Sequence, residues 1–317
     1  MPPQLRPLGA DSPLSTAAEH FLFYAEVELG YARQSLTKYR DCFRQITRMI
    51  GDRPVATYIK DDLLTVKSRM LSKGNSVSRQ VSILAALKRL LQFLRDEHRL
   101  PVLDPEFVLI PRRPRREVLF LTADEVERFV DAIPLTTERG KPSLNGIRFR
   151  ALVEALLGSA MRIGELLSIN RDQIDFANRE ARIIGKGNKE RTVFFTDRAL
   201  GWISTYLKAR TDSHPALFVC QDGQSRLKQP DIWRPFARVR ELAGLNKPVR
   251  PHLLRHTAAT QLLFNGCPVG HIKEILGHER LETTCRYYLG LDHRAAKSAH
   301  QKFLVYHENS AGASLAA

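Results

Sequence analysis

Residues 251–288 read PHLLRHTAATQLLFNGCPVGHIKEILGHERLETTCRYY and carry the densest set of chemically active side chains in the chain. Pro251 is typical of the first position of a helix. On that helix His252 and Arg255 lie three residues apart and therefore share a face. Arginine binds phosphate oxygens through a planar fork that stays charged, and histidine adds a directional donor or a base. The stretch therefore indicates phosphate chemistry.

The second half of the same stretch predicts a helix over 269–276 that stops at Gly277 and delivers His278 at its end. A tyrosine pair follows at 287 and 288. At about 100° per residue, a continuous helix would place Tyr287 opposite His278. We therefore expect a turn within 279–284 if both side chains face one phosphate.

A zinc site is a weak alternative for this region. His252 and His256 are spaced as in HExxH, but Leu253 stands where that motif needs glutamate. No metal or cofactor is expected.

Two upstream segments carry further candidate residues. The run GSAMRIGELL at 158–167 breaks one predicted helix, over 147–157, and begins another, which places Arg162 at a helix start. From the local pattern alone Arg162 is structural, with Glu165 as its partner three residues on. Strands at 181–184 and 191–195 predict a β-hairpin with Lys186 near its tip.

The first third of the chain predicts four helices, over 14–30, 31–50, 60–71 and 76–98. Arg79 and Lys88 lie on the last of these as candidate phosphate contacts. The alternative is an ordinary solvated basic face. Residues 111–118, which are rich in proline and arginine, are predicted to form a stiff linker that follows the DNA backbone; a merely soluble spacer is the alternative. Its candidate DNA contacts are Arg112, Arg113, Arg115 and Arg116.

The net charge of the 317-residue chain is +15, from 49 Lys and Arg against 34 Asp and Glu. Such an excess favours a polyanionic partner, and nucleic acid is the first candidate because each neutralised phosphate releases counterions. No signal peptide, membrane span or basic amphipathic helix supports a membrane partner. We therefore expect a cytoplasmic protein.

Four motifs in one order, MRIGELLSI, GKGNKERTV, HLLRHTAAT and LGHERLETTCRYY, resemble those of the tyrosine recombinase (phage integrase) family, especially its Xer-like bacterial branch. The resemblance implies a mainly α fold. It implies that a SAM-like core-binding domain of four helices spans 1–110. A linker over 111–118 and an α+β catalytic domain with a small β-hairpin or sheet over 119–317 are expected to follow. It also implies that the C-terminal helix, 291–307, docks on a neighbouring protomer; packing within one chain is the alternative.

The same resemblance assigns roles to individual residues. Arg162 and Arg255 match the two arginines that hold the scissile phosphate, and Glu165 matches an acidic position that braces the site. Lys186 matches the lysine that protonates the leaving oxygen. The remaining matches are His252 as base or donor, His278 as phosphate contact, and Tyr287 as nucleophile. Tyr288 is the rival nucleophile, but the family's common spacing of nine residues after the histidine selects Tyr287.

We therefore expect a recombinase that cleaves and rejoins double-stranded DNA at a specific site. A homotetramer on two duplexes would act without metal, through a 3′-phosphotyrosyl link and a Holliday junction. A type IB topoisomerase and a DNA-binding protein with an inert site are the alternatives. The sequence leaves open the DNA site, whether the setting is a chromosome, phage, transposon or integrative element, and whether a second recombinase or accessory protein takes part.

Overall fold

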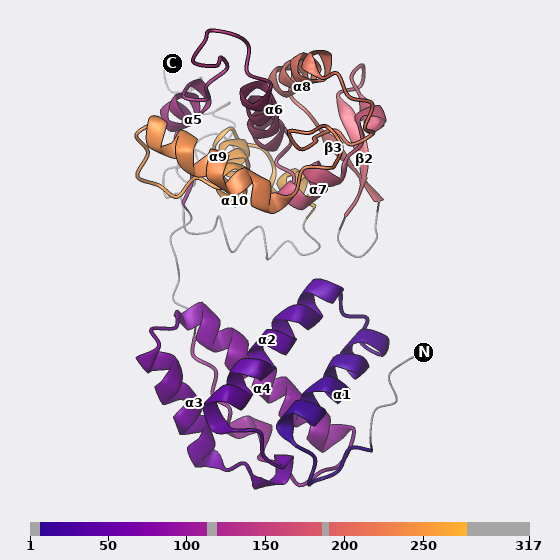
Figure 1. The fold of residues 1–317 in the computed structure, drawn as a ribbon, viewed down its shortest axis with the longest axis vertical. Coiled ribbons are helices and arrows are strands. Elements are labelled where there is room, and N and C mark those ends of the chain that lie inside the picture. The colour runs from indigo at the N-terminus through magenta and orange to yellow at the C-terminus, as the bar shows by residue number, and fades with distance from the viewer. Residues whose placement is uncertain (1–6, 113–118, 186–189, 278–317) are drawn as a thin grey trace, which may run out of the picture. The chain divides into compact units, whose positions relative to one another are not determined.

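The computed structural model describes residues 7–112, 119–185 and 190–277. The chain divides into two compact units, residues 1–116 and 117–317 (Figure 1). Within the described ranges, no helix is long and apolar enough to cross a membrane.

The first unit is a bundle of four helices, which confirms the four predicted from the sequence. They are α1 Leu14–Val27, α2 Arg33–Ile50, α3 Lys60–Ser72 and α4 Val77–Asp96. Their apolar faces meet in one core, where Phe21, Ile46, Val66 and Leu90 are almost fully buried. The α1 helix ends three residues earlier than predicted because the chain turns through Gly30, which has a φ of +62°.

The second unit is also mostly helical, with one small sheet. Its helices are α5 Ala123–Asp131, α6 Leu144–Ser159, α7 Ile163–Ser168, α8 Asp197–Ala209, α9 Gln229–Leu242, α10 Pro251–Phe264 and α11 Val269–Leu276. Its strands are β1 Ile174–Asp175, β2 Glu180–Ile184 and β3 Glu190–Phe194, in antiparallel order β1-β2-β3. The mainly α fold with a small sheet is as predicted.

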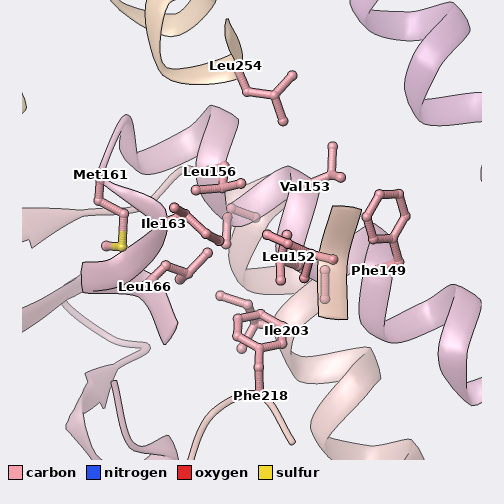
Figure 2. Close-up of a cluster of buried hydrophobic side chains, with 14 of the residues drawn as sticks. Phe149, Leu152, Val153, Leu156, Met161, Ile163, Leu166, Ile203, Phe218 and Leu254 are labelled. Atoms are coloured by element: carbon pink, nitrogen blue, oxygen red, sulfur yellow. The ribbon is translucent and has the colours of Figure 1, made fainter. Parts of the chain in front are cut away.

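Helix α6 is the centre of the second core. Its face packs closely on α8, because Gly158 has no side chain and a Cβ there would lie 2.4 Å from the Thr196 hydroxyl. Figure 2 shows Leu152 and Leu156 of α6 directed toward Ile163 of α7 and Ile203 of α8. Helix α7 thus packs on α6, and the candidate Arg162 immediately precedes its first residue.

The predicted β-hairpin is present as β2 and β3, paired from Glu180↔Phe194 to Ile184↔Glu190. The short strand β1 was not predicted, because two residues are too few to show an alternating pattern. Residues 186–189, which include Lys186, lie outside the described part of the chain.

Candidate active site

Arg162 stands at the start of α7, as its sequence position predicts, and Glu165 is its partner. The Arg162 backbone N–H donates to Glu165 Oε2 at 2.9 Å, and its Nη1 donates to Glu165 Oε1 at 2.8 Å. Its Nη2 donates to the carbonyl of Gly277 at 3.2 Å. The side chain stays 33% exposed, so the guanidinium is fixed in direction and still reachable from solvent.

Arg255 lies on the second turn of α10 and is buried, with 6% of the residue exposed. Its Nη1 donates to the carbonyl of Ala160 at 2.8 Å, and its Nη2 donates to the carbonyl of Leu276. Ala160 has a φ of +52°, a left-handed conformation that is unfavourable for a residue with a side chain. The strained turn after α6 thus supplies one of the carbonyl acceptors that orient Arg255.

A third arginine, Arg191 of β3, joins the same group and was not singled out by the sequence analysis. Its Nη2 donates to Glu165 Oε2 at 2.9 Å, and its Nη1 donates to the carbonyl of Ile275 at 3.0 Å. The side chain is 16% exposed. Its place in the quoted motif GKGNKERTV, next to the hairpin turn, was the available signal, but strand periodicity alone does not reveal where a guanidinium docks.

The three arginines converge on the last turn of α11. The carbonyls of Ile275, Leu276 and Gly277 each accept a hydrogen bond from a different one of them. Carbonyls at a helix C-terminus lack partners within the helix and carry the negative end of its dipole, so cations are favoured there. The result is a cluster of fixed positive charge at the carbonyls of residues 275–277, which precede His278 in the sequence.

His252 lies on the first turn of α10, and part of its side chain is exposed. Partial burial lowers its pKa below 6.5, and the positive charges of Arg255 and Arg162 lower it further. Burial also lowers the pKa of His256, with smaller contributions from His252 and Arg255. A neutral imidazole at pH 7 is able to accept a proton.

The Glu165 carboxylate is held between Arg162 and Arg191. Burial on its own raises the pKa of Glu165, but the Arg162 backbone N–H, the charge of Arg191 and the side-chain hydrogen bonds together bring it below the usual value of 4.5. The group is therefore ionised at neutral pH, and it neutralises part of the positive charge of the cluster.

The structure thus brings together the predicted residues Arg162, Glu165, His252 and Arg255. Of the other predicted catalytic residues, Lys186, His278 and Tyr287 lie outside the described ranges, as do Tyr288, the expected turn over 279–284 and the expected helix over 291–307. Within residues 7–112, 119–185 and 190–277, no cluster of three or more His, Cys, Asp or Glu side chains could hold a metal ion.

The candidate DNA contacts of the first unit are in different environments. Arg79 is partly buried, with its Nη1 3.9 Å from the Cys42 thiol. Lys88 forms an ion pair with Glu106 at 3.1 Å, and Arg112 is exposed. The linker arginines Arg113, Arg115 and Arg116 lie outside the described residues.

Comparison with known sequences places the second unit in a described family. Residues 119–294 match the model of the phage integrase family. The tyrosine recombinase XerC of Herpetosiphon aurantiacus is 29% identical over 288 residues, which cover 88% of this chain and 92% of that protein. The tyrosine recombinase XerD of Lacticaseibacillus casei is 29% identical over 301 residues, or 91% and 96% of the two chains.

Solved structures share the fold at lower identity. The Tn1549 transposon integrase, in complex with transposon right end DNA, superposes with a TM-score of 0.75 at 18% identity, covering 92% of this chain and 100% of that one. The XerH site-specific recombinase bound to its difH substrate superposes with a TM-score of 0.67 at 19% sequence identity. The match covers 93% of this chain and 97% of that one. Both comparisons extend over the four-helix unit as well as the unit that holds the arginine cluster.

Proposed function

The chain belongs to the phage integrase family, and from this premise we propose that it recombines double-stranded DNA at a specific site, with Tyr287 as its nucleophile. It is a tyrosine recombinase of the Xer-like branch, an enzyme that cleaves and rejoins DNA strands. The observation that carries the proposal is the meeting of Arg162 and Arg255 on adjacent carbonyls, those of residues 277 and 276.

Two arginine side chains held this close together are suited to bind one scissile phosphate. In the proposed reaction the arginines donate to its non-bridging oxygens and stabilise the extra negative charge of the pentacovalent transition state. A guanidinium carries five N–H donors, and Arg162 uses two of them for Glu165 and Gly277. Because the donors are fixed before DNA arrives, little reorganisation is needed during the reaction.

The remaining residues complete the proton transfers. The Tyr287 oxygen attacks phosphorus and forms a 3′-phosphotyrosyl bond, while the bond to the 5′ oxygen breaks and that oxygen takes the electron pair. His252, held neutral by its lowered pKa, accepts or steers the tyrosine proton. Lys186 supplies a proton to the departing oxygen. His278, which follows Gly277 in the sequence, adds a donor to the phosphate.

The rejoining of DNA strands reverses these steps, but with the 5′ hydroxyl of a different strand. The freed hydroxyl of one duplex attacks the phosphotyrosyl bond of the other, which gives a Holliday junction that a second pair of exchanges resolves. Two duplexes with one cleavage site per strand need four nucleophiles, so we propose a homotetramer. The setting we propose is the bacterial nucleoid in the cytoplasm, whether on a chromosome or on a mobile element.

The first unit serves this reaction as a DNA clamp. We propose that residues 1–110 form the core-binding domain, 111–118 the linker and 119–317 the catalytic domain. Arg79 and the linker arginines contact phosphates directly. Lys88 must first exchange its ion pair with Glu106 for a phosphate, and because that pair is partly exposed the exchange is energetically inexpensive.

A nicked suicide substrate tests the reaction. The DNA site is first selected by binding from a randomised duplex library, and cleavage is then measured in EDTA. We expect a covalent adduct resistant to SDS with the unmodified protein and with Tyr288→Phe, and none with Tyr287→Phe. An adduct retained by Tyr287→Phe would exclude this nucleophile. Relaxation of a supercoiled plasmid that lacks the selected site would instead indicate a topoisomerase.

A further inference from the structure

We propose that Arg191 is a positioning residue that ties the C-terminal end of α11 to Glu165 and thereby fixes the direction of Arg162. The inference rests on the proposed function only in taking Arg162 as a phosphate-binding residue. Arg191 itself is not assigned a contact with DNA.

The first support is the bonding pattern. Glu165 accepts from Arg162 with both carboxylate oxygens, and the oxygen that takes the backbone N–H also accepts from Arg191. The other end of the Arg191 guanidinium donates to the carbonyl of Ile275, two residues before the Gly277 carbonyl that accepts from Arg162. Arg191 therefore closes a ring that joins α7, β3 and α11.

The second support is the absence of space at Gly277. A Cβ built there would lie 2.7 Å from Arg191 Nε and 2.8 Å from its Cζ, closer than real Cβ contacts allow. Gly277 also has a φ of +59°, which ends α11. Gly277 therefore both allows the turn that ends α11 and leaves room for the Arg191 side chain.

The third support is that part of the Arg191 side chain is energetically unfavourable to bury. Its Nε is buried and has no hydrogen-bond partner among the described residues, and leaving a buried donor unsatisfied is unfavourable. Buried ion pairs often add little net stability, whereas they can fix one arrangement over others. The contribution of Arg191 is therefore to the geometry of the site more than to stability.

Cleavage measured separately from binding tests the role. Arg191→Met is compared with Arg179→Met, which removes the same charge from an exposed ion pair with Asp197 in the same unit. We expect Arg191→Met to slow adduct formation at saturating DNA about 100-fold, the effect of a misplaced catalytic group. Its DNA affinity should match that of Arg179→Met. Arg191→Lys should recover part of the rate, because lysine keeps the charge but not the two-ended fork.

A double-mutant cycle with Glu165→Gln separates positioning from general loss of structure. If Arg191 acts through Glu165, the combined variant should cleave about as slowly as the slower single variant. Effects that multiply would overturn the proposal, as would an Arg191→Met rate equal to that of Arg179→Met.

A glycine pair provides a second route if Arg191→Met does not fold, which thermal unfolding will show. Gly277→Ala places a methyl group against Arg191. Gly266→Ala, after α10, imposes a similar backbone strain at φ +80° with nothing within 4 Å. We expect slow cleavage only for Gly277→Ala, and equal rates for the two would contradict the inference. Loss of the adduct in Tyr287→Phe, measured in parallel, shows independently whether the proposed nucleophile stands.

Discussion

Two groups of basic side chains in this protein, one from each unit, are held in different ways. In the four-helix unit, Arg53 and Lys88 form partly exposed ion pairs with the carboxylates of Asp62 and Glu106. In the second unit, Arg162, Arg191 and Arg255 are directed by backbone carbonyls at the end of one helix. Surface cations are easily redirected and screened by salt, whereas fixed donors in a partly desolvated site act on one atom position. The first arrangement suits affinity and the second suits catalysis.

The largest effect should come from removing a fixed arginine. We expect Arg255→Met and Arg162→Met each to lower the cleavage rate at saturating DNA by about 10²–10³-fold, the loss typical of one preorganised donor to a developing charge. DNA affinity should fall no more than it does for Arg179→Met. A large fall in DNA affinity with an unchanged cleavage rate at saturating DNA would remove the distinction between the two kinds of arginine.

Removing an exposed cation should have a smaller effect, and it should change DNA affinity and not the cleavage rate. Arg112→Ala should weaken DNA binding and reduce the slope of log affinity against log salt by about 1 if the side chain neutralises one phosphate. Cleavage at saturating DNA should not change. DNA-binding titrations at salt concentrations from about 50 to about 200 mM measure this slope, because affinity from phosphate contacts falls steeply over that range. An unchanged slope would show that Arg112 does not contact a phosphate.

The smallest effect concerns the two histidines beside the arginines. Both have a pKa below 6.5 in the folded protein, so at lower pH the unfolded chain binds more protons than the folded one. The free energy of unfolding should therefore decrease as the pH falls through and below 6.5, until the folded pKa is passed. Urea unfolding at pH 7.5 and 5.5 measures it. The combined variant His252→Gln and His256→Gln should show a weaker pH dependence, and an unchanged one would contradict the assigned pKa shifts.

Local sequence signals predicted much of this architecture. The end of α11 at Gly277 and the pairing of Arg162 with Glu165 were predicted correctly, because each depends on residues within one or two turns of helix.

The missed features depend on distant segments. Arg191 contacts Glu165 and Ile275, residues 26 and 84 positions away, so the periodicity of its own strand does not indicate these partners. The break after α6 comes at Ala160, because the φ of +52° there is sustained by the surrounding fold and not by a glycine. The pairing of Lys88 with Glu106 likewise required the return of the chain after α4.

The most direct test of the central claim is to identify the residue bound to DNA. The covalent complex formed on the suicide substrate in EDTA is digested with nuclease and protease, and the modified peptide is sequenced by mass spectrometry. We expect a nucleotide joined to Tyr287 through its 3′ phosphate when Arg162 and Arg255 are intact, and a much reduced yield of it in Arg255→Met. Modification of Tyr288, or the same yield of adduct in Arg255→Met, would contradict this expectation.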